Sequence, residues 1–262
     1  MARVLSALVL LPLVFGTAWF LPPIATLLLA EAVLILAFLE YARLASSLGA
    51  RLSTGVPLVG AAATVAAVPY GATAVVLMAS GLTIAIVSLT TIRSDDRTLL
   101  DVTASLFPLL YLGLPLGALV AVHVSGGRTA VVLLLGTIVL SDTAQYYGGR
   151  AFGRTPLAPA ISPRKTVEGA CCGVIVGVGL MLIAGELALG RATLLQRLLL
   201  GAVLVGLGIA GDLFESQLKR AAGVKDASGL IPGHGGMLDR IDGFLFAAPG
   251  FYVFLQLMGA GE

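Results

Sequence analysis

The chain has 262 residues, of which 58% are hydrophobic and 11% are charged, and its formal net charge is +2. A soluble domain is about 25% charged, and one core cannot hide apolar runs of about 20 residues that recur along most of a chain. The composition therefore excludes an ordinary soluble protein, and the small net charge, without a basic stripe, argues against a nucleic-acid partner.

Nine apolar stretches are long enough to be helices that cross about 30 Å of hydrocarbon. They lie at 4–21, 24–40, 55–70, 72–91, 102–122, 128–147, 167–188, 196–214 and 243–259. The sequence therefore predicts an all-α, polytopic transmembrane protein. We expect one membrane-embedded domain over 1–262, with N-terminal spans in 1–139 and the candidate catalytic spans and loops in 140–259.

The first stretch also has the form of a secretory signal peptide. One arginine precedes the apolar run, and Gly16-Thr17-Ala18 is a possible cleavage site. We expect a retained span because the run extends to Leu21 and ends at Pro22-Pro23. A cleaved signal is the alternative.

The basic residues predict the orientation of the spans, because cytoplasmic loops of membrane proteins carry an excess of Lys and Arg. With nine spans and a cytoplasmic N-terminus, thirteen of the sixteen basic residues lie inside. These are Arg3, Arg43, Arg51, Arg93, Arg97, Arg150, Arg154, Arg164, Lys165, Lys219, Arg220, Lys225 and Arg240. Only Arg128, Arg191 and Arg197 lie outside, and the C-terminus is then outside as well.

Polar residues gather at the predicted cytoplasmic ends of the spans, where a carboxylate costs about 3 kcal/mol to insert and so needs a partner or a function. Asp142 lies near the end of the sixth stretch and shares a helical face with Gln145 and Tyr146. Cys171 and Cys172 are adjacent in an apolar run and cannot form a disulfide framework or a zinc site, so we interpret them as packing residues.

A basic connection, Ser162-Pro163-Arg164-Lys165-Thr166, directly precedes the seventh stretch, and Glu168 lies one turn inside that stretch. This pattern predicts a helix cap combined with a phosphate site. The plain alternative is that basic residues at an inner membrane surface only set topology and contact headgroups.

The eighth stretch ends in a polar stripe, because Asp212, Glu215, Ser216 and Lys219 follow the i, i+3, i+4, i+7 spacing. The plain alternative is a helix that emerges into water, with Glu215 and Lys219 as an ordinary ion pair.

The ninth stretch is preceded by a glycine-rich loop and by two carboxylates. Asp239 and Asp242 are three residues apart, which suits either a helix N-terminus or a Mg²⁺ site. Residues 225–236 include Lys225 and His234 among glycines, whose backbone amides can point at an anion. Carboxylates for a cation and two basic loops for phosphates together predict a site for a nucleotide and an anionic lipid, with phosphoryl-type transfer as the chemistry.

These stretches resemble the signature of a known family, the phosphatidate cytidylyltransferases or CDP-diacylglycerol synthases. The resemblance is carried by Ser216-Gln217-Leu218-Lys219-Arg220, by Lys225-Asp226 and by Pro232-Gly233-His234-Gly235-Gly236-Met237-Leu238-Asp239-Arg240-Ile241-Asp242. Two further stretches are similar, namely 162–169, where Arg164 stands in place of a common Lys, and 142–150. Glu40-Tyr41-Ala42-Arg43 is a weak match.

The resemblance implies a nucleotidyltransferase of phospholipid biosynthesis that converts CTP and phosphatidate to CDP-diacylglycerol and diphosphate. It implies a Mg²⁺ cofactor with room for a second cation, a homodimer, and an active site that faces the cytoplasm from a bacterial inner membrane. The catalytic residues would be Asp212, Lys219, Arg220, Lys225, Asp239 and Arg240. The substrate-binding residues would be Ser162, Arg164, Lys165, Thr166, His234, Gly235, Gly236 and Tyr146. The metal ligands would be Asp212, Asp239, Asp242 and Asp142.

Other function classes compete with this interpretation. An ion-coupled transporter would carry charges near the bilayer midplane, where only Glu31 is expected. A CDP-alcohol phosphatidyltransferase would have Asp-Gly followed by Ala-Arg, whereas Asp242-Gly243 is followed by Phe244-Leu245. A related CTP-dependent enzyme that acts on another lipid phosphate or alcohol stays open.

Overall fold

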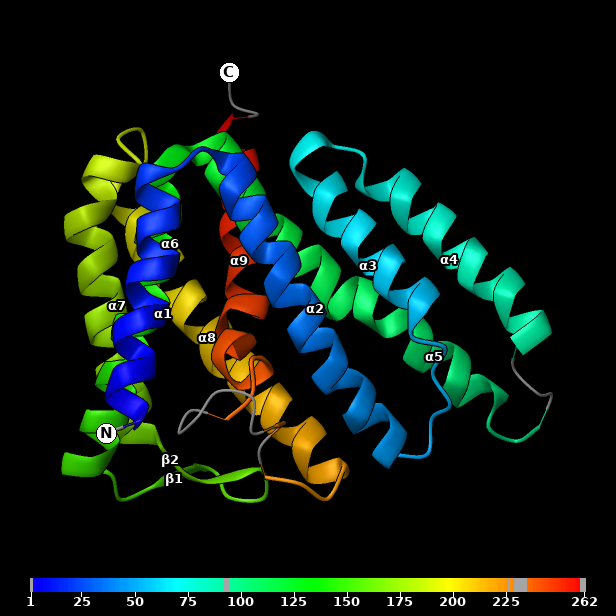
Figure 1. Cartoon of the computed structure of the whole chain (residues 1–262). Coiled ribbons are helices and arrows are strands. Elements are labelled where there is room, and N and C mark those ends of the chain that lie inside the picture. The colour runs from blue at the N-terminus through cyan, green and yellow to red at the C-terminus, as the bar shows by residue number, and fades with distance from the viewer. Residues whose placement is uncertain (1, 92–94, 226, 229–234, 260–262) are drawn as a thin grey trace.

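A computed structural model of the protein describes residues 2–91, 95–225, 227–228 and 235–259, which fold mostly into helices (Figure 1). The helices are α1 (Ala2–Phe20), α2 (Pro23–Ser47), α3 (Gly55–Ala67), α4 (Thr73–Thr91), α5 (Thr98–Pro108), α6 (Leu114–Phe152), α7 (Val167–Ala188), α8 (Leu194–Ala221) and α9 (Leu238–Gly259). A 3₁₀ turn, Val68–Tyr70, follows α3, and a π turn, Leu109–Gly113, joins α5 to α6. The all-α, multi-pass membrane fold predicted from the sequence is confirmed.

All nine predicted stretches are helical, but the boundaries between the helices differ from those between the predicted stretches. Six helical segments in the described residues are long and apolar enough to cross a membrane. One of them, Thr98–Phe152, has 55 residues and contains both 102–122 and 128–147. Gly127, with φ of 72°, interrupts it between the two stretches. The shorter apolar helices Leu8–Phe20 and Gly55–Tyr70 correspond to the first and third stretches, so the number of crossings stays a prediction.

Successive helical segments run in alternate directions between two ends of the molecule (Figure 1). The start of α1 lies at the end that also carries the two strands, and the last turn of α9 lies at the opposite end. This alternation agrees with the predicted succession of spans.

A short antiparallel hairpin is the main departure from the predicted helices and loops. Strand β1 (Pro156–Ala158) pairs with β2 (Ser162–Thr166), with Pro156 opposite Thr166 and Ala158 opposite Ser162. The strands are short and have no alternating apolar pattern, so they could not be predicted from the sequence.

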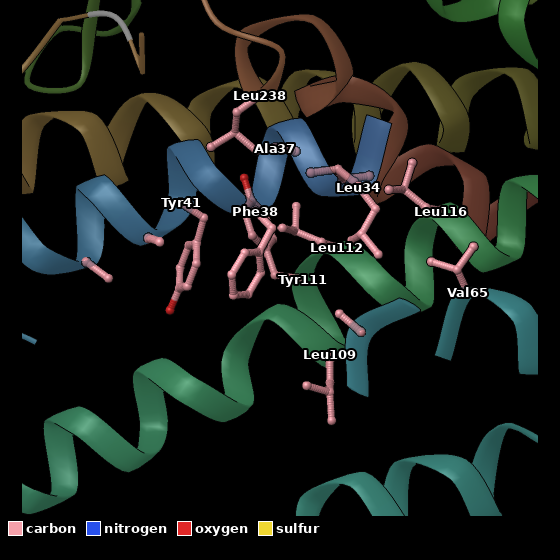
Figure 2. Close-up of a cluster of buried hydrophobic side chains, with 14 of the residues drawn as sticks. Leu34, Ala37, Phe38, Tyr41, Val65, Leu109, Tyr111, Leu112, Leu116 and Leu238 are labelled. Atoms are coloured by element: carbon pink, nitrogen blue, oxygen red, sulfur yellow. The ribbon is translucent and has the colours of Figure 1, made fainter. Parts of the chain in front are cut away.

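The larger of two main apolar cores links the N-terminal helices to the start of α9. Leu34 and Phe38 of α2 pack in it with Leu112 of the π turn and with Leu238, the first residue of α9, and all four are fully buried (Figure 2). Aromatic contacts continue from Tyr111 to Phe214 of α8, with ring centroids 5.4 Å apart. The core therefore fixes α8 and α9 against the first half of the chain.

Candidate active site

The predicted site residues that the structure describes lie where α6 and α8 end and where α7 and α9 begin, at the end of the molecule that carries the hairpin (Figure 1). Lys165, on β2, forms an ion pair with Asp212 of α8. The hydroxyl of Ser216 donates a hydrogen bond to Asp212, with 3.4 Å between the oxygens. The ammonium group of Lys165 is buried, so this carboxylate holds it in place.

A second lysine lies between two carboxylates. Lys219 Nζ is 2.5 Å from Glu215 Oε2 and also donates to Asp239 Oδ1. Glu215 is 0% exposed and Lys219 is 8% exposed, so the pair is not a solvated surface pair on a helix that emerges into water. Asp239 also accepts hydrogen bonds at Oδ2 from the amides of Gly236 at 2.8 Å and Ala227 at 3.2 Å.

Asp212 also interacts with two further carboxylates, which come from other helices. Asp142 of α6, Asp212 of α8 and Asp242 of α9 interact electrostatically with one another. Asp142 also accepts a hydrogen bond from Gln145 Nε2 at 3.0 Å, as their shared helical face predicts. Within the described parts of the chain, no group of three or more His, Cys, Asp or Glu side chains is arranged to hold a metal ion.

Glycines bring α8 and α9 together at this point. A Cβ on Gly211 would collide with the backbone carbonyl of Asp242, and one on Gly243 would lie 3.5 Å from the carbonyl oxygen of Gly208. Because both helices have glycine at the crossing, their backbones approach closely. Asp212 and Asp242, next to these glycines, are thereby placed near each other.

Thr166 is the N-cap of α7, as predicted. Its Oγ1 accepts a hydrogen bond from the amide of Gly169 at 3.1 Å. Glu168 accepts hydrogen bonds from the amides of Arg154 at 3.0 Å and Thr155 at 3.2 Å, which ties the chain before β1 to the first turn of α7. These contacts fix the strand that carries Lys165.

The remaining predicted residues lie around these pairs. Arg220 donates to the carbonyl oxygens of Ile161 at 3.4 Å and Val224 at 3.1 Å, which links the end of α8 to the hairpin. Arg240 is exposed and interacts electrostatically with Asp142. The other predicted residues are Arg164, Lys225 and Tyr146, which are exposed, Ser162, which is half-buried, and Gly235, which adopts a φ of 82°. His234 lies outside the described residues.

Glu40 is the residue that the site prediction missed. It lies on α2, is 2% exposed, and accepts hydrogen bonds from the amides of Met237 at 2.9 Å and Leu238 at 2.7 Å. The local signal was an acid at the end of an apolar stretch within a weakly matching motif. Its partners lie 197 and 198 residues away, and nothing in the sequence indicates that contact.

Proteins similar to this chain include several phosphatidate cytidylyltransferases. A phosphatidate cytidylyltransferase of Helicobacter pylori strain J99 is 40% identical over 156 residues, which are 59% of this chain and 57% of the relative. One from Aquifex aeolicus is 40% identical over 158 residues, 60% of this chain and 58% of the relative. The chloroplastic phosphatidate cytidylyltransferase 5 of Arabidopsis thaliana is 40% identical over 137 residues, 52% of this chain and 34% of the relative.

Each of these matches thus spans less than two thirds of the relative's own length. The family model described as "Cytidylyltransferase family" is broader, because it matches residues 1–258. The chain that carries these two lysine–carboxylate pairs therefore belongs to the cytidylyltransferase family.

Proposed function

We propose that this protein is a phosphatidate cytidylyltransferase, which converts CTP and phosphatidate to CDP-diacylglycerol and diphosphate. Family membership and the names of the three relatives support the reaction class and the lipid substrate. The observation that carries the proposal is a pair of lysines at the hairpin end of the molecule. Lys165 is half-buried and Lys219 is buried, and each is paired with an aspartate.

The proposed reaction forms one P–O bond and breaks another. An oxygen of the phosphatidate phosphate attacks the α-phosphorus of CTP, and the bond from that phosphorus to the oxygen bridging to the β-phosphate breaks, releasing diphosphate. The attacking phosphate is already ionised, so the reaction needs no general base. The chain has to orient two anions and offset the charge that develops on the leaving group.

Lys165 and Lys219 suit this electrostatic role because their carboxylate partners fix both ammonium groups before substrate arrives. Prearranged charges cost no reorganisation during the reaction. Arg220, Lys225 and Arg240, which the resemblance also implies, would supplement them at the more exposed edge of the site.

Mg²⁺ is part of the proposal, with Asp142, Asp212, Asp239 and Asp242 as its proposed ligands. Asp142, Asp212 and Asp242 offer hard oxygen ligands and repel one another, but as the structure places them they are not arranged as a metal site, so binding of Mg²⁺ would require these side chains to move together. Asp212 and Asp239 are each paired with a lysine, so a metal at either carboxylate would compete with that lysine. A bound Mg²⁺ would supply further stabilisation of phosphate charge.

The orientation and assembly are part of the same proposal. The excess of basic residues predicts that the hairpin end faces the cytoplasm, and the bacterial relatives favour the inner membrane. The resemblance further implies a homodimer.

The test is diphosphate release by the purified protein in detergent with Mg²⁺, CTP and phosphatidate. Release should require the lipid, prefer CTP over ATP, GTP and UTP, and fall at least about 100-fold in Lys165→Ala. Arg154→Ala removes an exposed positive charge at the same end of the molecule and should leave the rate unchanged.

Assays with other lipid phosphates and with lipid alcohols distinguish this proposal from a related CTP-dependent enzyme. Folded wild-type protein that is inactive with phosphatidate but releases diphosphate with another lipid phosphate or alcohol would establish the related CTP-dependent enzyme instead. Inactivity with every acceptor would overturn the nucleotidyltransferase proposal.

A further inference from the structure

Glu40 connects the first half of the chain to two short stretches beside the site. Besides the amides of Met237 and Leu238, it accepts a hydrogen bond from the hydroxyl of Ser228, with 2.5 Å between the oxygens. One buried carboxylate of α2 therefore holds both 227–228 and 236–238.

Asp239 repeats this pattern from within α9. It binds the amide of Ala227 in the first stretch and the amide of Gly236 in the second, and it pairs with Lys219. The two stretches are thus joined twice, by carboxylates from different parts of the chain. Displacing one carboxylate would disturb the donors of the other.

Gly236 shows how tightly this arrangement is packed. A Cβ at that position would lie 2.5 Å from Glu40 Oε2, so a larger residue could not stand there without displacing the carboxylate. An amide that is buried without an acceptor is costly, and a carboxylate at a helix N-terminus is favoured by the helix dipole. Loss of Glu40 would therefore shift the backbone at the start of α9.

We propose that Glu40 is a positioning residue for cytidylyl transfer, which holds stretches 227–228 and 236–238 so that Asp239 fixes the ammonium group of Lys219. This inference rests on the proposed function. Glu40 acts through these contacts and does not touch substrate, so its loss should lower kcat more than it changes KM.

The experiment combines kinetics with hydrogen exchange on the full chain in detergent. In Glu40→Gln, the carboxamide presents a donor toward an amide that is itself a donor. Exchange at the amides of Met237 and Leu238 should rise at least about tenfold while the amides of α7 exchange as in the wild type. The kcat for lipid-dependent diphosphate release should fall by about tenfold to 100-fold, with less than about a threefold change in KM for CTP.

Two variants accompany it. Glu31→Gln alters a second carboxylate of α2, which is half-buried and not among the contacts of 227–228 and 236–238, and it should change neither exchange nor kcat. Ser228→Ala removes one donor to Glu40 without altering the buried charge, so it should raise exchange at 237–238 and lower kcat, both less than Glu40→Gln does. If Glu40→Gln does not fold, Ser228→Ala decides the question.

Wild-type exchange at 237–238 in Glu40→Gln, or raised exchange with unchanged kcat, would overturn the positioning role. Unchanged exchange and kcat in Ser228→Ala would do the same where Glu40→Gln does not fold. Absence of lipid-dependent release from the folded wild type would count against the proposed function instead, since the exchange result does not depend on activity.

Discussion

Lys219 and its partners form a charged cluster that is largely withdrawn from water. The lysine lies 2.5 Å from Glu215 Oε2 and pairs with Asp239, and Glu215 is fully buried. Burial of charged groups is costly even when they are paired, so such a cluster is weak evidence for stability. A cluster kept at the end of a membrane helix, beside other predicted site residues, is better explained by function.

We expect Lys219 and Asp239 to act as one unit in catalysis. Lys219→Met and Asp239→Asn should each lower kcat/KM at least about 100-fold, and the double variant should lose little more than either single variant, because both changes remove the same fixed charge pair. The measurement is a double-mutant cycle on lipid-dependent diphosphate release.

The matched control cycle pairs Lys219→Met with Lys165→Met. The two lysines have different carboxylate partners, so their losses should add in free energy to within about 0.5 kcal/mol. Additive losses for Lys219 and Asp239 would contradict the proposal that they work together.

Local patterns were enough to select both lysines and their aspartates. Lys219 follows Asp212 at i+7 on one helical face, and Lys165 stands in a basic stretch before a helix. Their pairing could not be predicted, because Lys165 meets Asp212 and Lys219 meets Asp239 across separate elements. Contact between residues that are distant in the chain depends on packing, which local spacing does not determine.

The crossing of α8 and α9 is the element on which the carboxylates depend. Gly211→Ala should destabilise the protein by about 1–3 kcal/mol, because the added Cβ would collide with the backbone carbonyl of Asp242. Gly206→Ala, on the same helix with open space around the position, should be neutral or stabilising by up to about 1 kcal/mol. Thermal unfolding in detergent measures both changes, and equal effects would show that the crossing is not tightly packed.

Substitutions at the N-caps of α7 and α8 can distinguish an effect on stability from an effect on activity. Thr166 and Thr193 each cap a helix through the side-chain oxygen, but Thr166 adjoins Lys165 and Thr193 lies before α8, away from the site. Thr166→Ala and Thr193→Ala should each lose about 1 kcal/mol of stability. Only Thr166→Ala should also lower kcat/KM, and similar losses of activity in both variants would contradict a site beside the α7 cap.

Helix prediction succeeded where apolar runs ended at clear polar boundaries. The stretch 167–188 coincides with α7, Val167–Ala188, since Thr166 caps its start. At Gly127 the positive φ interrupts a helical run that the sequence presents as two stretches, and no polar loop intervenes. The hairpin was missed because its strands are short and are held by contacts with α7 and α8 as well as by each other.

At the scale of the whole molecule, the fold class followed from composition, since long apolar runs have few alternatives in a membrane. The orientation stays a prediction that single cysteines can test. In a Cys171→Ala, Cys172→Ala background, Arg191→Cys should react with a membrane-impermeant maleimide in intact bacteria, and Arg154→Cys should react only after permeabilisation. The reverse pattern would contradict a cytoplasmic site.

The central claim is that the chain transfers the cytidylyl group of CTP to phosphatidate. The most direct measurement follows CTP labelled at the α-phosphate during incubation of the purified protein with phosphatidate and Mg²⁺. We predict that the label enters the lipid as CDP-diacylglycerol, with one diphosphate released for each labelled lipid. Release of diphosphate by folded protein with no label in the lipid would contradict the account.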